Sequence, residues 1–293
     1  MRVLLFGGNG WIGGMFKQCW NKLYPEDEVI VSSQRVKFEN KKSIMAEIEA
    51  ADRVVSMIGR TSGVMPDGTV VNNIDFCESH PRENLIDNLV GPFMLARCCE
   101  MLNKHFLYLG TGCIFSWETD KSVERRVKEE DYPDFFGSAY SIAKGQTDSL
   151  MKEFENVCNA RIRMPIVNQD TPRNFISKII RYKNIHNMPN SMTYLPEMLP
   201  ILVECSRRKI TGTVNCTNPG YIDHKTVLTM YKDKVDPSHT FDLVTDPEQL
   251  QLKSKRSNNV LDTAIVEGIA KSVGLPLSSI TDAMTHCFDN WNR

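Results

Sequence analysis

The stretch Arg2-Val-Leu-Leu-Phe6-Gly7-Gly-Asn-Gly10-Trp-Ile-Gly13-Gly14, at the start of the sequence, decides the fold. The apolar run at 2–6 predicts a buried strand, and apolar residues after the glycines recur at the spacing of one helical face. A strand, a glycine turn and a helix N-terminus form an anion site, because backbone N–H groups and the helix dipole face a bound pyrophosphate. The spacing therefore predicts a dinucleotide site. The residues expected to contact the cofactor in this turn are Gly7, Gly10, Trp11, Ile12 and Gly13.

Composition narrows the class of protein. Of the 293 residues, 41% are hydrophobic and 24% charged, as in ordinary globular proteins, and the net charge of -1 gives no reason to expect a nucleic-acid or membrane partner. No apolar run approaches the ~20 residues of a membrane span. The nine cysteines include no CxxC pair, and the six histidines have no metal-like spacing, so we expect a cytoplasmic protein without a metal site.

The end of the second predicted strand, at 29–32, indicates which dinucleotide is bound. NAD-binding proteins usually carry an acidic residue here for the ribose 2′-hydroxyl. The segment instead reads Ser32-Ser-Gln-Arg35-Val-Lys37, with no acid before Glu39. Ser33 and Arg35 would accept a 2′-phosphate, which predicts NADP(H), used as NADPH. The alternative is a solvated turn with chance basic residues.

The order of predicted elements indicates an α/β fold: a Rossmann-type doubly wound parallel sheet with a smaller C-terminal substrate-binding lobe. We expect an NADP(H)-binding domain at 1–165, a returning edge strand near 212–217, and a substrate-binding lobe over most of 166–293. The other expected strands are 53–58, 105–109 and 160–166, and the expected helices are 41–51, 81–102, 137–155, 174–182, 223–233 and 260–273. Loops are expected at 62–74 and 118–131. Further cofactor contacts are expected from Ile58, Gly59, Arg60 and Asn88.

The stretch Leu107-Tyr-Leu-Gly-Thr111-Gly-Cys113-Ile-Phe115 carries candidate chemistry. Ligands of open α/β sheets sit beyond the carboxyl ends of the strands, so Thr111 and Cys113, two residues apart, are expected to face one pocket. The threonine hydroxyl can bind a carbonyl oxygen, and the thiol can ionise. The alternative is a glycine-rich turn with a buried structural cysteine.

The segment Tyr140-Ser-Ile-Ala-Lys144 places a phenol and an amine one helical turn apart. An ammonium beside a phenol favours the ionised phenol, which would make Tyr140 a proton donor and acceptor. Such a pair also occurs by chance in many proteins. Here it follows a glycine fingerprint and a strand-end threonine, which favours the catalytic interpretation.

Together these residues resemble the extended short-chain dehydrogenase/reductases that act on nucleotide sugars. The chain resembles in particular the bifunctional 3,5-epimerase/4-reductases of UDP-rhamnose synthesis, from residue 2 to about residue 265. Segments 62–74 and 116–127 depart from that pattern. The motifs that carry the resemblance are Thr-Gly-Cys-Ile-Phe at 111–115, Lys-Glu-Glu-Asp at 128–131, Glu-Asn-Val-Cys at 155–158, Arg-Met-Pro-Ile at 163–166, Pro-Arg-Asn-Phe-Ile at 172–176, Pro-Asn-Ser-Met-Thr at 189–193, Asn-Pro-Gly at 218–220 and Arg-Ser-Asn-Asn at 256–259.

The resemblance implies NADPH-dependent conversion of UDP-4-keto-6-deoxy-D-glucose to UDP-L-rhamnose. Its reductase residues are Thr111, Tyr140 and Lys144. A C4 ketone acidifies C3 and C5, so epimerisation needs an acid/base on each face of the sugar, and Cys113 is one candidate. GDP-fucose synthase, a related epimerase-reductase, has a second acid/base. The matching segment of this sequence has Asn174, which cannot ionise, and Lys178 one helical turn later. We assign that role to Lys178; the alternative is a surface lysine.

Arg256 is expected to bind the UDP phosphates; the alternative is a structural salt bridge. The residues expected to contact the sugar are Asn174, Lys178, Thr111 and Cys113. Two other functions remain open: a 4-reductase acting on an already epimerised sugar, which would not need Cys113, and a non-catalytic NADP-binding regulatory subunit. The sequence leaves the oligomeric state open, with a homodimer as the candidate assembly.

Overall fold

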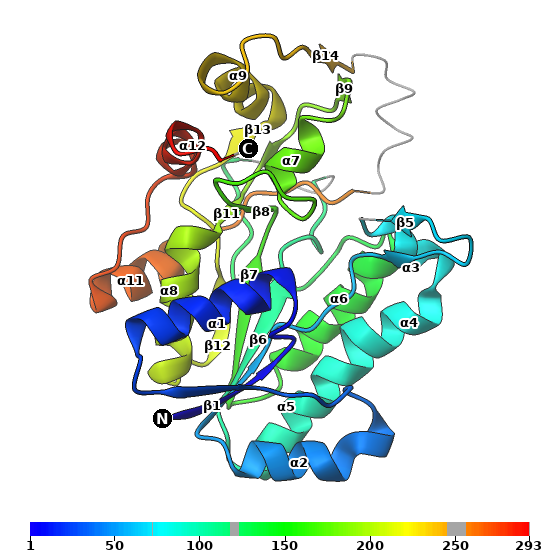
Figure 1. Ribbon diagram of the computed structural model, residues 1–293, viewed down its shortest axis with the longest axis vertical. Helices are drawn as coiled ribbons and strands as arrows, with labels where there is room; N and C mark the ends of the chain where they lie inside the picture. The colour runs from blue at the N-terminus through cyan, green and yellow to red at the C-terminus, as the bar shows by residue number, and fades with distance from the viewer. Residues whose placement is uncertain (72, 118–122, 245–255, 293) are drawn as a thin grey trace. The chain divides into compact units, whose positions relative to one another are not determined.

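The computed structural model describes residues 1–71, 73–117, 123–244 and 256–292 (Figure 1). The predicted loops at 62–74 and 118–131 therefore lie partly outside the described residues. The chain forms two compact units: the first comprises Met1–Ile114, Tyr132–Arg161 and Leu199–Val214, and the second comprises Phe115–Asp131, Ile162–Met198 and Asn215–Arg293.

A six-stranded sheet forms the centre of the first unit. Its order is β12-β7-β6-β3-β1-β2, and the pairs β1–β2, β1–β3 and β3–β6 are parallel. The strands are β1 (Arg2–Phe6), β2 (Glu28–Val31), β3 (Arg53–Ser56), β6 (Phe106–Thr111), β7 (Val157–Ile162) and β12 (Gly212–Asn215), with a small hairpin of β4 (Gly63–Val64) and β5 (Val70–Val71). The predicted doubly wound parallel sheet is confirmed, and the returning strand lies at its edge.

Helices cover both faces of this sheet (Figure 1). One face carries α1 (Trp11–Leu23) and α8 (Leu195–Arg207), and the other carries α2 (Lys41–Glu49), α4 (Pro81–Leu85), α5 (Gly91–Met101) and α6 (Ala139–Met151). A 3-10 turn (Phe38–Asn40) and α3 (Asp75–Ser79) complete the unit. Because β1 is followed by β2 on one side and pairs with β3 on the other, the chain reverses direction across the sheet between β1 and β3. That reversal is where ligands of such sheets bind.

The second unit is built from short strand pairs and helices around its own apolar core. Its pairs are β8 (Pro165–Ile166) with β11 (Thr193–Tyr194), β9 (Asn184–Ile185) with β14 (Asp242–Leu243), and β10 (Pro189–Asn190) with β13 (Ile222–Asp223). Its helices are α7 (Phe175–Ile179), α9 (His224–Lys234), α11 (Ala264–Val273) and α12 (Ile280–Asp289).

Several predicted boundaries were wrong for identifiable reasons. The strand expected at 105–109 continues through Gly110, where a Cβ would lie 2.3 Å from Asn159 Oδ1, so the glycine admits a neighbouring side chain rather than ending the strand. The strand expected at 160–166 is interrupted at Met164, whose φ of 42° is left-handed. The predicted helix at 174–182 ends after Ile179, and the one at 260–273 begins only at Ala264.

The predicted helix at 81–102 contains a π-helical turn, Ile86–Val90, between α4 and α5. The apolar period of this helix predicts that Leu85, Leu89, Phe93 and Ala96 pack on the sheet. Ala96 is buried, but Leu85 and Phe93 are 44% and 37% exposed, and Asn84 and Asn88 are buried. Buried asparagines do not show in an apolar period, which explains the wrong part of the prediction.

Candidate active site

The glycine turn after β1 leaves no room for side chains. Gly7 has a φ of +80°, and a Cβ there would lie 2.8 Å from the carbonyl carbon of Met57, at the end of β3. A Cβ on Gly13 would lie 2.2 Å from the Gly7 carbonyl oxygen. Gly10 is the N-cap of α1 and has no side chain with which to cap it. The turn is thus a cradle of backbone N–H groups at a helix N-terminus, which fits a dinucleotide pyrophosphate. Trp11 and Ile12, both half-buried, begin the helix.

Two arginines, one after β2 and one after β3, bind one carboxylate. Arg35 and Arg60 both donate to Asp87, which lies in the π-helical turn and whose side chain is only 12% exposed. Two guanidiniums against one carboxylate leave a net positive charge, as a 2′-phosphate site requires. Ser33 is exposed, and its neighbour Ser32 donates to Glu47 at 2.6 Å. Sequence reasoning missed Asp87 and Glu47, because both lie on helical segments distant in the chain from Ser33 and Arg35.

Asn88 shapes the loop after β3. Its side chain is fully buried, accepts from the Arg60 N–H at 2.9 Å and donates to the Arg60 carbonyl at 2.9 Å. A third bond reaches Asn84 Oδ1 at 2.8 Å. Gly59 lies against it: a Cβ there would be 3.3 Å from Asn88 Oδ1. Asn88 thus holds the backbone of 58–60, and its contact with the cofactor stays a prediction.

Thr111, Cys113 and Tyr140 lie close together in the first unit. The Cys113 N–H donates to Thr111 Oγ1 at 3.1 Å, and Ser141 Oγ donates to the Cys113 carbonyl at 2.8 Å. Cys113 and Cys19 are half-buried, and the other seven cysteines are buried. Burial raises the pKa of the Tyr140 phenol, the nearby Cys113 adds to that rise, and a hydrogen bond with Thr111 opposes it. The strand end thus presents a hydroxyl and a partly accessible thiol beside a protonated phenol.

Lys144 contacts a residue that the sequence did not suggest. Its ammonium donates to the hydroxyl of Tyr108 on β6 and lies 3.4 Å from the Leu109 carbonyl oxygen. Burial lowers the pKa of Lys144 to about 7, against a smaller opposing influence of Asp148. The expected lowering of the Tyr140 pKa by Lys144 is not found: burial of both groups has the larger effect. Tyr108 was missed because it looks like any aromatic core residue of a strand.

In the second unit, Asn174 and Lys178 have separate roles. Asn174 is fully buried and caps α7: its amide donates to the carbonyls of Val167 and Gln169, each at 2.8 Å, and accepts from Ile176 N–H. These bonds hold the start of α7, and a contact of Asn174 with the substrate stays a prediction. Lys178, one turn along α7, is half-buried, and burial followed by the charge of Arg173 lowers its pKa.

Arg163 joins three of the sequence motifs within the second unit. Its side chain is fully buried and donates to Asn190 Oδ1, to the Ser257 carbonyl at 2.7 Å and to Ser257 Oγ at 3.4 Å. Ser257 Oγ in turn donates to the Phe115 carbonyl at 2.6 Å. These bonds fix the backbone next to Arg256, which is exposed.

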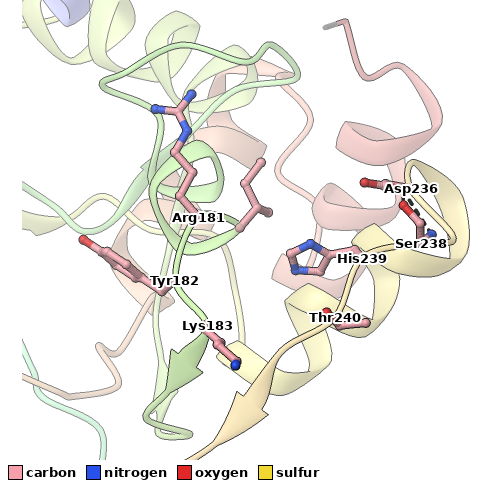
Figure 2. A pocket seen from close by; sticks show the side chains of 8 residues that line it. Arg181, Tyr182, Lys183, Asp236, Ser238, His239 and Thr240 are labelled. Atoms are coloured by element: carbon pink, nitrogen blue, oxygen red, sulfur yellow. Dashed lines mark hydrogen bonds between the residues drawn. The ribbon is translucent and has the colours of Figure 1, made fainter.

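A shallow hollow of about 350 Å³ lies elsewhere in the second unit (Figure 2). Arg181 at its edge is paired with Asp170 at 3.3 Å. Its lining residues are Ile180, Arg181, Tyr182, Lys183, Asp236, Ser238, His239 and Thr240, and none of them was predicted as a site residue. Among the described residues, no His, Cys, Asp and Glu cluster could hold a metal ion, and no helix is long and apolar enough to cross a membrane.

Comparison with known proteins agrees with this geometry. Residues 3–181 match the model of the NAD dependent epimerase/dehydratase family. The crystal structure of the L780 UDP-rhamnose synthase of Acanthamoeba polyphaga mimivirus is 37% identical, has a TM-score of 0.87 and covers 99% of each chain. A bifunctional dTDP-4-dehydrorhamnose 3,5-epimerase/dTDP-4-dehydrorhamnose reductase of Arabidopsis thaliana is 40% identical over 88% of this chain and 84% of its own length.

A likeness in fold alone extends further. The dTDP-4-dehydrorhamnose reductase of Bacillus anthracis, in complex with NADP, has a TM-score of 0.73 and covers 98% of each chain at 14% identity. The family match spans more than half of the chain and includes the glycine turn, the strand end at Thr111 and the Tyr140–Lys144 helix. The chain belongs to the NAD dependent epimerase/dehydratase family.

Proposed function

We propose that this enzyme uses NADPH to convert UDP-4-keto-6-deoxy-D-glucose to UDP-L-rhamnose, by 3,5-epimerisation and 4-keto reduction in one chain. The observation that carries the proposal is the partly accessible thiol of Cys113, bonded through its own N–H to Thr111 Oγ1 and adjacent to Tyr140. A reductase alone has no use for that thiol. The Arabidopsis relative is named for both activities, and the mimiviral relative is named as a UDP-rhamnose synthase, which supports the proposal.

NADPH fits the first unit. The glycine cradle suits its pyrophosphate, and the Arg35–Asp87–Arg60 cluster suits its 2′-phosphate. When bound, the cofactor supplies a hydride to C4 of the sugar. The backbone of 58–60, held by Asn88, is proposed to line the same site.

Epimerisation requires that protons leave and return at C3 and C5. The C4 ketone stabilises the resulting carbanion as an enolate, and Thr111 is proposed to donate to the ketone oxygen. Cys113 is proposed to exchange a proton on one face of the sugar. Lys178 is proposed as the second acid/base, supported by its half-buried position and lowered pKa, which make proton loss near neutral pH easier.

Reduction requires a proton on the C4 oxygen. Tyr140 is proposed as the donor, because burial keeps its phenol protonated and its bond with Thr111 orients it. Lys144 is proposed to stabilise the phenolate that remains and to bind the nicotinamide ribose. Arg256 is proposed to bind the UDP phosphates from the second unit. We propose a UDP sugar as the substrate because the mimiviral relative is named as a UDP-rhamnose synthase. The Arabidopsis relative is named for the dTDP sugar.

We further propose a cytoplasmic homodimer. The nine cysteines are all free, which suits a reducing compartment. Helices α5 and α6 pack together, and four apolar residues here are each at least 36% exposed: Leu85 at the end of α4, Phe93 on α5, and Ile142 and Leu150 on α6. A second copy of the chain would cover them. Sedimentation should find a dimer that Ile142→Asp dissociates; a monomeric unaltered protein would refute the assembly.

The function is tested by incubating the protein with NADPH and UDP-4-keto-6-deoxyglucose in D₂O and identifying the product by NMR. The expected product is UDP-L-rhamnose carrying deuterium at C3 and C5, with one NADPH oxidised per sugar. Reduction without exchange at C3 and C5 would indicate a 4-reductase alone. NADPH binding without any turnover would indicate a regulatory subunit. Either result overturns the proposal.

A further inference from the structure

Lys144 is held by an aromatic residue across from it. It projects from α6 toward β6, where its ammonium donates to the Tyr108 hydroxyl and lies 4.4 Å from the centre of the Tyr108 ring. The two residues are 4% and 1% exposed, so water does not replace either contact. A hydroxyl and a ring face both favour the charged amine.

The charged and titratable groups around Lys144 do not take over that role. Asp148, one turn along α6, binds Arg161 at 2.7 and 2.8 Å and accepts from Asn159 at 2.7 Å, so its carboxylate is engaged on β7. Cys113 and Asp148 both act on Lys144 from a distance and favour its protonated form. Tyr140, one turn earlier on α6, is bonded to Thr111.

Burial makes the protonation of the Lys144 amine sensitive to its contact with the Tyr108 hydroxyl. Desolvation lowers the pKa of Lys144 to about 7, so near neutral pH small changes in its contacts decide how much of it is charged. Loss of a hydrogen bond that the charged amine makes would lower the pKa of Lys144 further.

We propose that Tyr108 is a positioning residue for the reductase step: its hydroxyl orients the Lys144 ammonium and keeps it protonated. The inference rests on the proposed function, in which Lys144 must be charged to stabilise the Tyr140 phenolate. In this arrangement Tyr108 acts through its contact with Lys144.

The test uses Tyr108→Phe, which removes the hydroxyl and keeps the ring. In cofactor-free protein labelled with ¹³C at the lysine ε-carbon, the Lys144 signal is assigned by its loss in Lys144→Met and followed against pH. In the unaltered protein it should titrate near neutrality, and in Tyr108→Phe the midpoint should move down by about one pH unit, the scale of a charge-assisted bond. Tyr231→Phe, a buried tyrosine of the second unit, should leave the midpoint unchanged.

The pH profile of ketone reduction gives the second measurement. Below the midpoint Lys144 is charged, so activity is kept; above it the amine is neutral and activity is lost. The alkaline limb of Tyr108→Phe should therefore fall about one pH unit earlier, with similar turnover on the acid side. An unmoved NMR midpoint in a folded Tyr108→Phe overturns the inference. A shifted midpoint in a protein that reduces no ketone would instead refute the proposed function and leave the Tyr108–Lys144 pair established.

Discussion

The carbonyl oxygen of Gly7 occupies the space that a side chain on Gly13 would need, with only 2.2 Å between that oxygen and a Cβ at Gly13. This contact ties the strand end of β1 to the first turn of α1 and forms the cradle assigned to the cofactor. A methyl group there must push the turn and the helix apart.

Gly13→Ala should therefore weaken NADPH binding at least ~10-fold and lower stability by ~1–3 kcal/mol, the cost of overpacking a tight site. Gly14→Ala is the matched control, because its Cβ would lie 3.6 Å from the Gly8 carbonyl, an ordinary contact. Alanine inside a helix should leave that variant as stable as the unaltered chain or slightly more so. Fluorescence titration and thermal unfolding measure both effects, and equal behaviour of the two variants would contradict the cradle.

Arg35→Ala tests the 2′-phosphate site. Removing one of the two guanidiniums on Asp87 should weaken NADPH by roughly ten- to a hundredfold, since a charge-assisted contact contributes ~1.5–3 kcal/mol. NADH, which lacks the phosphate, should bind almost as before. Arg97→Ala, which removes a surface arginine paired with Glu100, serves as control. An equal loss for both cofactors in a titration would mean that Arg35 supports the loop instead.

Tyr140→Phe tests the proton donor. Oxidation of NADPH with the ketone substrate should fall at least ~100-fold, the usual scale of acid catalysis. NADPH affinity should change little, because the phenol itself is proposed to act on the sugar oxygen. Turnover close to that of the unaltered enzyme would remove Tyr140 from the mechanism.

Cys113→Ser separates the two activities. A thiol ionises near ~8.5, whereas a serine hydroxyl does not ionise usefully in water. The variant should lose deuterium exchange at C3 or C5 in the absence of NADPH, yet still bind NADPH and reduce an already epimerised substrate. Lys178→Met should also impair exchange, at one of the two carbons. Cys19→Ser alters the other half-buried cysteine and should exchange normally. Exchange at both carbons at the usual rate in Cys113→Ser would make that cysteine structural.

Asp148→Asn tests the buried ion pair between α6 and β7. Asp148 and Arg161 are 3% and 0% exposed, so removing the carboxylate takes a negative charge away from a buried guanidinium. Unfolding free energy should fall by ~3–5 kcal/mol. Asp170→Asn breaks a pair whose side chains are 36% and 57% exposed and should cost at most ~1 kcal/mol. Denaturant titration measures the unfolding free energy of both variants. Similar losses of unfolding free energy would show that burial of the Asp148–Arg161 pair does not matter.

The sequence was informative wherever a contact lies within one element or one turn. The glycines at 7, 10 and 13 and the Tyr140–Lys144 pair are such cases, because strand and helix periodicities place near neighbours in predictable positions. The doubly wound sheet followed from the same periodicities. They misled on part of the helix at 81–102, where Leu85 and Phe93 are exposed while Asn84 and Asn88 are buried.

The sequence by itself determined the glycine fingerprint, the Thr111–Cys113 strand end and the Tyr140–Lys144 pair on α6, since each depends on local spacing. Only the tertiary structure decided that Asp87 joins Arg35 to Arg60 and that Tyr108 holds Lys144. These pairings depend on strand order, which brings distant residues together. The low pKa of Lys144 likewise follows from burial, a property of the packed chain that no local pattern encodes.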